Sequence, residues 1–173
     1  MRLSAANKRR GGFSLLEMMA ATTIMAVIMG SVVVVIRSGY AVWNAHEQDL
    51  DIAENGYDVL RHFVRQMRQA GSVTSITAAS NTTGSLSFVN ASGVTQTWSL
   101  DGSSQVNFNN GTSTQLLAKS INQLSFVGYK SDGVTATTTV AEIHIVKCTV
   151  QFTLTKGGGT TKNVSAMAWI RSW

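Results

Sequence analysis

Proline is absent from this 173-residue sequence, cysteine occurs once, and charged residues make up only 13% of it. Without proline, a long helix meets none of the commonest breaks. A single cysteine excludes an internal disulfide. The formal net charge of +5 is concentrated at one end, because four of the fourteen Lys and Arg residues lie within the first twelve positions. The remaining ten face nine acidic residues, a balance that gives little support to DNA binding.

The N-terminal 36 residues combine a basic stretch, a glycine pair and a long apolar segment. The basic residues directly before the glycine pair are Lys8, Arg9 and Arg10. Gly11-Gly12 is followed by Phe13, and no charged residue occurs from Met18 to Ile36. That length is sufficient for a helix to cross a bilayer. Glu17 therefore lies at the start of a membrane segment, where a carboxylate is expensive without a partner.

This pattern resembles the class III signal of type IV prepilins and of the pseudopilins of type II secretion systems. The resemblance implies that a prepilin peptidase cuts after Gly12 on the cytoplasmic side and that Phe13 becomes N-methylated. It also implies that Glu17 pairs with the N-terminal amine of a neighbouring subunit during filament assembly. A free α-amine, with a pKa near 7.7–8.0, is largely cationic at neutral pH. Such an ion pair in an apolar core would fix the register of the subunits more than add net stability.

Two other interpretations of the N-terminus differ in the cleavage that they predict. A secretory signal peptide would be cut after its apolar stretch, at a site built from small residues. The residues that follow Ile36 here are Arg37-Ser38-Gly39-Tyr40-Ala41, which do not form a convincing site of that kind. An uncleaved signal anchor would explain the basic stretch and the apolar segment, but not the presence of Gly12 and Glu17.

The chain from Arg37 onward predicts the second half of the same helix. Residues recur at alternating spacings of three and four, as on one face of an amphipathic helix: Trp43, His46, Leu50, Ala53, Tyr57, Leu60, Val64 and Met67. Gly71 is the expected C-terminal stop. A helix over 13–70 would be about 87 Å long at about 1.5 Å per residue. We expect this face to pack against a sheet, the alternative being a free-standing coiled coil.

Beyond Gly71 the sequence becomes rich in Ser, Thr, Asn, Gly and Val, and predicts strands separated by turn sequences. The predicted strands are Val73 to Thr77, Ser85 to Val89, Val94 to Leu100, Gln105 to Phe108, Ile121 to Tyr129, Ala141 to Thr155 and Asn163 to Arg171. Ile143 and Ile145 are out of phase with the apolar alternation from Val146 to Leu154, which predicts a β-bulge near Val146. The expected fold is α+β, an antiparallel sheet on the C-terminal half of a long helix, as in type IV pilins.

Residues of the helix and the head sharpen the resemblance. The run Ala53-Glu54-Asn55-Gly56-Tyr57, with Arg68-Gln69-Ala70-Gly71 after it, is similar to the helix of PilW-type minor pilins and J-type pseudopilins. Segments 124–129 and 168–172 resemble strands of the same group. The expected organisation is a cleaved leader (1–12), a transmembrane or filament-core helix (13–36), an amphipathic helix (37–71) and an extracytoplasmic β-rich head (72–173).

Residues able to carry catalysis or to bind metal are few. The three histidines have no cysteine or acid partner at metal-ligand spacing, and Gly157-Gly158-Gly159 lacks the context of a phosphate loop. Cys148 is expected to be a small buried apolar residue, and His144 a solvent-facing strand residue. Asp101 and Asp132, in turns, are at most weak calcium ligands. We therefore predict no enzyme, no cofactor and no metal site.

Three classes of function remain compatible with the sequence. The first is a minor pilin or pseudopilin of the inner membrane, cytoplasmic at its N-terminus, whose partners are the prepilin peptidase, other pilin subunits, the assembly platform and membrane lipid. The second is a competence-type pilin that binds DNA, for which the candidate cations are Lys119, Lys130, Lys147, Lys156, Lys162 and Arg171. The third is a signal-anchored carbohydrate-binding protein, with Trp98, Trp169 and Trp173 as stacking platforms.

Overall fold

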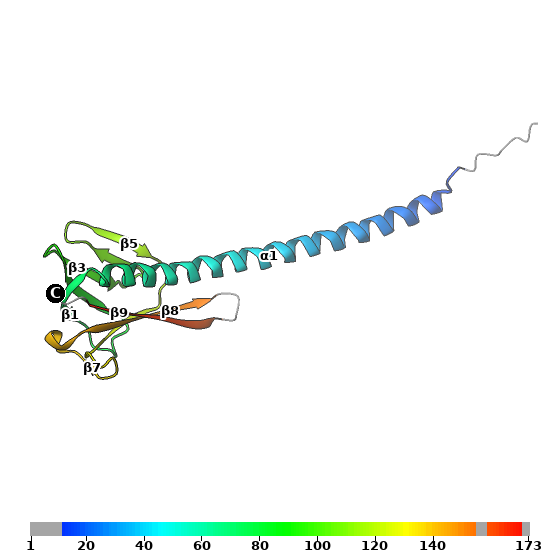
Figure 1. Ribbon diagram of the computed structural model, residues 1–173. Helices are drawn as coiled ribbons and strands as arrows, with labels where there is room; N and C mark the ends of the chain where they lie inside the picture. The colour runs from blue at the N-terminus through cyan, green and yellow to red at the C-terminus, as the bar shows by residue number, and fades with distance from the viewer. Residues whose placement is uncertain (1–11, 155–158, 171–173) are drawn as a thin grey trace, which may run out of the picture. The chain divides into compact units, whose positions relative to one another are not determined.

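The computed structural model describes residues 12–154 and 159–170, and the chain divides into two compact units at Asn44/Ala45. A single helix, α1 (Leu15–Met67), supplies the first unit and begins the second (Figure 1). In the first unit the side chains of α1 are exposed along nearly the whole of its length. In the second unit the end of α1 joins the strands in one hydrophobic core.

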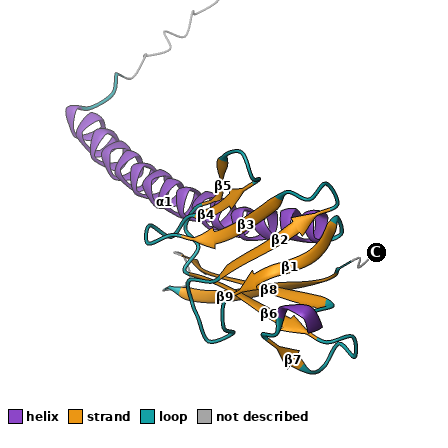
Figure 2. Ribbon diagram, turned by 90° about the vertical axis from the view of Figure 1, so that its left-hand side faces the viewer, coloured by secondary structure: helices purple, strands orange, loops and turns teal. Residues whose placement is uncertain are grey.

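The strands form two antiparallel sheets (Figure 2). The first contains, in spatial order, β1 (Ala70–Ile76), β2 (Ser85–Asn90), β3 (Thr95–Leu100), β4 (Val106–Asn109) and β5 (Thr114–Ala118). The second contains β7 (Ala136–Thr137), β6 (Gln123–Tyr129), β8 (Ile145–Leu154) and β9 (Thr160–Trp169). A short 3₁₀ helix, η1 (Val140–Glu142), precedes β8. The predicted α+β class is confirmed, with two sheets in place of one.

The loop before β2 joins the two sheets to each other. The backbone N–H of Gly84 donates to the Leu124 carbonyl at 2.7 Å, and the N–H of Leu124 donates to the Thr82 carbonyl at 2.9 Å. A Cβ atom on Gly84 would lie 2.5 Å from the Leu124 oxygen. Because this close approach of two backbones leaves no room for a side chain, the junction requires glycine.

The buried face of α1 packs against both sheets. Val59, Phe63 and Met67 are almost fully buried, with Ile52 packed at the edge of the same cluster. The facing sheet residues form one continuous core: Leu86, Phe88, Trp98, Phe108, Leu124, Phe126, Val146, Cys148, Val150 and Phe152. Burial of this apolar surface is the main force that holds the helix end on the sheets.

The buried face of the helix is rotated from the predicted one. Leu60 and Met67 are buried as predicted, but Trp43, Leu50 and Tyr57 are 71%, 57% and 54% exposed. The prediction was wrong because Gly56, which adds nothing to an apolar pattern, lies at the centre of the face that packs.

Gly56 makes a close contact with Phe152 that predicts a stability loss on substitution. A Cβ atom at position 56 would lie 2.6 Å from Cε1 and 2.8 Å from Cδ1 of the Phe152 ring. Overpacking of this kind costs about 1–3 kcal/mol, against a helix-propensity gain of about 1 kcal/mol for alanine. We expect Gly56→Ala to lower the denaturant midpoint of the detergent-solubilised chain.

Gly39→Ala is the matched control for Gly56→Ala. Gly39 is also helical, and its added Cβ would meet nothing within 4 Å. This variant should be as stable as the parent or slightly more stable. Equal midpoints for the two variants would show that the Phe152 ring moves aside at no cost.

Trp98 is at the centre of the aromatic core and contacts a helix histidine. Its ring stacks on Phe88 with centroids 4.9 Å apart and planes 16° apart. Its indole Nε1–H donates to Nδ1 of His62 at 3.2 Å. His62 is half-buried, and burial, with the nearby Arg65 cation, lowers the pKa of its imidazole from the ordinary value of 6.5.

The lowered pKa of His62 predicts that the protein is less stable in mild acid. The folded state binds fewer protons than the unfolded chain, so unfolding becomes more favourable as pH falls through about 6.5. We expect the melting temperature of the solubilised chain to be lower at pH 5.5 than at pH 7.5. The His62→Gln variant should show a smaller difference between these pH values. An unchanged difference would assign the pH dependence to other groups.

Three parts of the strand prediction differ from the structure. The strand predicted from Ala141 begins at Ile145, because η1 occupies Val140–Glu142. Strands β5 and β7 were not predicted, because β5 is a mostly exposed edge strand without apolar alternation and β7 has only two residues. The predicted bulge near Val146 is wrong, since β8 pairs in continuous register with both β6 and β9. Ile145 is buried on the opposite sheet face, where its Cδ1 lies beside Gly133 of the turn after β6.

The end of α1 also differs from the prediction. The helix ends at Met67, the chain turns through Arg68 and Gln69, and Ala70 begins β1 as a buried residue. Gly71, the predicted stop, is therefore a strand residue. Pairing of Ala70 with Asn90 in β2 explains why the first strand begins three residues before Val73, the predicted start.

Candidate functional site

The N-terminus of α1 is closed by a reciprocal pair of hydrogen bonds. The backbone N–H of Ser14 donates to Oε2 of Glu17 at 2.8 Å, and the backbone N–H of Glu17 donates to Oγ of Ser14 at 3.2 Å. This is a capping box, in which residues three apart satisfy each other's unpaired amides. Glu17 thus has a local role that the sequence interpretation did not assign, although the Ser-x-x-Glu spacing was available to indicate it.

The residues at the predicted cleavage point lie just before this cap. Gly12, Phe13 and Ser14 precede the first helical residue, and the Phe13 side chain is 83% exposed. Lys8, Arg9 and Arg10 of the leader lie outside the described residues. The Gly12–Phe13 peptide bond is therefore in non-helical, exposed chain, which is the form of backbone that a peptidase can bind.

The geometry of Glu17 leaves its carboxylate able to bind a second donor. Oε2 accepts the Ser14 amide, and an ionised carboxylate has about four acceptor positions over its two oxygens. A cationic amine from another molecule can therefore bind Oε1 while the capping box stays intact. The structure brings Ser14 and Glu17 together, and places Gly12 and Phe13 directly before them.

The apolar part of α1 satisfies its few polar groups internally. The hydroxyls of Thr22, Thr23 and Ser31 donate to carbonyls three residues back, at 3.0, 2.8 and 2.7 Å. These bonds remove the unpaired donors that hydrocarbon does not tolerate. In the described residues α1 is the one helix long and apolar enough to cross a membrane, and its apolar stretch is not buried.

Residues 7–33 match the family model of the prokaryotic N-terminal methylation motif. The segment is a type IV prepilin-like signal. The match spans Gly12, Phe13, Glu17 and most of the apolar stretch, and it agrees with the resemblance noted from the sequence. The matched residues run into the exposed apolar part of α1, which is long and apolar enough to cross a membrane. No curated protein and no solved structure gives a significant match to the chain.

The pilin-like head buries one of the three predicted carbohydrate platforms. Trp98 is 1% exposed, so it cannot stack on a sugar in the folded head, and this assignment was wrong. Trp169 on β9 is 60% exposed, and Trp173 lies outside the described residues. Of the three tryptophans that the carbohydrate-binding hypothesis requires, Trp169 is the one that the described residues show exposed.

The titratable residues of the head serve its structure. Cys148 is fully buried, as predicted, and burial raises the pKa of its thiol well above the ordinary value. His144 is half-buried and lies just before β8, not within it. Over 12–154 and 159–170, no three His, Cys, Asp or Glu side chains gather as a metal site.

Asp101 and Asp132 both close turns. Asp101 accepts the amides of Ser103 and Gln105, and Asp132 accepts those of Val134 and Thr135. A further hydrogen bond, from the Thr135 hydroxyl, is the largest reason why the pKa of Asp132 falls to about 2. The carboxylates proposed as weak calcium ligands are thus occupied by turn amides.

The cations considered for DNA binding do not form one stripe. Lys130 forms an ion pair with Glu142 at 2.9 Å, Lys147 is on β8 and Lys162 on β9. Lys156 and Arg171 lie outside the described residues. A closer group of cations, at the end of α1, was not considered for DNA from the sequence: Arg61, Arg65 and Arg68.

Proposed function

We propose that this chain is a minor pilin or pseudopilin, a structural subunit incorporated into, or priming, a type IV pilus or a type II secretion pseudopilus. The observation that carries the proposal is the prepilin-like signal at 7–33, placed on an exposed apolar helix whose N-terminus is capped by Glu17. The resemblance of 53–71 to PilW-type minor pilins and J-type pseudopilins supports the finer assignment.

In this proposal each N-terminal residue has a distinct role. The prepilin peptidase cuts after Gly12, and the new amine of Phe13 is methylated. Lys8, Arg9 and Arg10 hold the leader on the cytoplasmic side, in line with the positive-inside rule, so the head is extracytoplasmic. The Glu17 carboxylate then binds the N-terminal amine of a neighbouring subunit in the filament core. The remaining partners are the other pilin-like subunits, the inner-membrane assembly platform and lipid.

Intact mass and N-terminal sequencing of the chain from membranes of its native host test the proposal. We expect a mature chain that begins at Phe13 and is heavier by one methyl group. The Gly12→Ala variant should accumulate as precursor, because the peptidase loses the residue at its cut, while Gly102→Ala, in an open turn of the head, should be processed normally.

Two other results would overturn the proposal. A chain that still begins at Met1 would be a signal-anchored surface protein. A chain cut beyond Ile36 would be a secreted protein that has lost the apolar segment altogether.

A further inference from the structure

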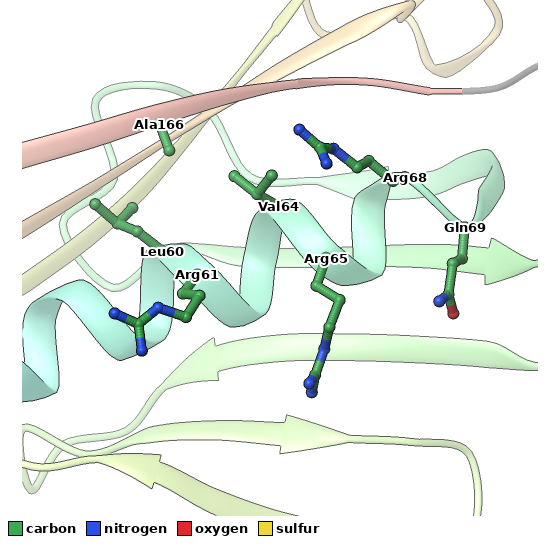
Figure 3. A pocket seen from close by; sticks show the side chains of 7 residues that line it. All are labelled: Leu60, Arg61, Val64, Arg65, Arg68, Gln69 and Ala166. Carbon is green, nitrogen blue, oxygen red and sulfur yellow. The ribbon is translucent and has the colours of Figure 1, made fainter.

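A groove with a basic border lies between the end of α1 and strand β9. It has a volume of about 670 Å³ and is lined by Leu60, Arg61, Val64, Arg65, Arg68, Gln69 and Ala166. Leu60 and Val64 point toward Ala166 and make an apolar floor (Figure 3). Arg68 extends on the same side of the helix, and Arg61 and Arg65 extend away from Ala166 along the border. The lining includes no acidic residue.

The same arginines end a charged stripe along α1. Four acidic and then three basic residues follow one another at spacings of 4, 3, 4, 3, 4 and 3, which places the first six on one face of α1 and the seventh in the turn that directly continues it: Glu47, Asp51, Glu54, Asp58, Arg61, Arg65 and Arg68. All seven are exposed. Two of these residues form an ion pair within the chain: Nη1 of Arg61 lies 3.4 Å from Oδ1 of Asp58. Arg65 and Arg68 have no ion pair within the part of the chain that the structure describes.

The acidic and basic parts of the stripe are related by one constant offset. Moving along the chain by 14 residues takes Glu47 to Arg61, Asp51 to Arg65, and Glu54 to Arg68 in the turn after α1. The same offset takes Leu50, which is 57% exposed, to Val64 on the groove floor. Fourteen residues are four turns of helix, about 21 Å of axial displacement.

We propose that the groove docks the acidic 47–54 segment of α1 from a second copy of this chain. The two helices lie parallel, displaced by about 21 Å, so that three acid–arginine pairs surround the contact of Leu50 with Val64. The parallel orientation and the displacement rest on the proposed function, since the subunits of one filament point the same way and follow one another along its axis. With no displacement, acid would face acid and arginine would face arginine.

Two features favour a polypeptide over nucleic acid as the occupant. The apolar floor of Leu60, Val64 and Ala166 matches a side chain such as Leu50 and offers nothing to a phosphate. The complementary charges also occur in the same chain at the matching spacing. DNA bound through phosphates would need cations alone.

Cysteine cross-linking between two differently tagged full-length copies, expressed together in the native host and recovered in sheared filament or pseudopilus fractions, tests the register. One copy carries Glu54→Cys, and the other carries Arg68→Cys or Arg61→Cys. The native Cys148 is buried and does not compete. We expect an oxidative heterodimer for the 54/68 pair, which the parallel displacement brings together. The 54/61 pair, which an antiparallel arrangement would bring together, should give little. Equal yields, a preference for 54/61 or no cross-link would overturn the proposal.

A charge exchange then tests the pairing. Arg65→Glu in the copy that supplies the groove should lower the 54/68 yield about fivefold, because an attractive pair becomes repulsive. Asp51→Arg in the other copy should restore it. Lys162→Glu makes the same charge change on β9 outside the groove lining and should have no effect. Failure of rescue, or an equal effect of Lys162→Glu, would contradict the pairing.

Two further readouts separate this proposal from its alternatives. Salt-sensitive binding of duplex DNA by the solubilised chain, lost in Arg65→Glu together with an absence of rescue, would assign the groove to nucleic acid. N-terminal sequencing of the same samples reports processing at Gly12 independently. A processed chain without the 54/68 cross-link would refute the groove contact and leave the pilin-like function standing.

Discussion

Replacing Glu17 with valine is expected to keep the chain in the membrane and to remove it from filaments. Valine makes the apolar segment longer and more compatible with lipid. In the proposed docking role, it also deprives the N-terminal amine of a neighbouring subunit of its counter-ion, and an unpaired charge in an apolar core is strongly disfavoured. We expect at least about a tenfold lower recovery in sheared filament or pseudopilus fractions, with normal recovery in total membranes.

The capping box adds two variants that separate the possible roles of Glu17. Glutamine keeps the amide-accepting oxygen of a capping box but has no charge. Ser14→Ala removes the hydroxyl partner of the Glu17 amide and keeps the carboxylate. If the docking role is right, Glu17→Gln will be as defective as Glu17→Val, and Ser14→Ala will assemble. If helix capping is what assembly needs, Ser14→Ala will be defective and Glu17→Gln nearly normal.

Trp98→Ala is expected to cause the largest stability loss in the head. The ring is 1% exposed, stacks on Phe88 and lies 5.1 and 5.6 Å, centroid to centroid, from Phe108 and Phe63. Truncation of a buried tryptophan costs about 3–5 kcal/mol, from lost burial and the cavity left behind. Denaturant unfolding of the solubilised chain, followed by circular dichroism, should show this shift.

Trp169→Ala is the matched control, since the same side chain is removed from a position that is 60% exposed. Its loss in free energy of unfolding should be much smaller than that of Trp98→Ala. Trp98→Phe keeps most of the ring and loses the N–H that His62 accepts, so it should fall between the two. A loss for Trp169→Ala as large as that for Trp98→Ala would mean that the aromatic cluster is not the centre of the fold.

The sequence predicts the N-terminal part well because its signals are local. A charge-free stretch with a basic, glycine-ended leader is recognisable without any tertiary contact, and the motif match at 7–33 agrees with it. The capping box was missed although it is equally local, because Glu17 was considered only as a residue for contacts between subunits.

The helix face was harder to predict because two apolar stripes lie side by side on it. Leu50 and Tyr57 fit the three-four spacing as well as Val59 and Phe63 do. Only the sheets decide which stripe is buried, and they select the one that contains Gly56, where the Phe152 ring fits against bare backbone.

The strands were predicted where burial imposes alternation and missed where it does not. Strands β2 and β6 alternate between buried and half-buried residues and were found nearly to the residue. The edge strand β5 is held by pairing with β4 and has little inward-facing surface, so its sequence carries no period of two.

Because Cys148 is buried, the rate at which its thiol is labelled reports how often the folded head opens. A thiol reagent in the surrounding water cannot reach the sulfur while the core formed by α1 and the two sheets is closed. Labelling at this single position therefore requires that core to open, and its rate follows how often the opening occurs. In an intact filament the same reaction would measure how much the neighbouring subunits slow the opening of each head, with no mutation.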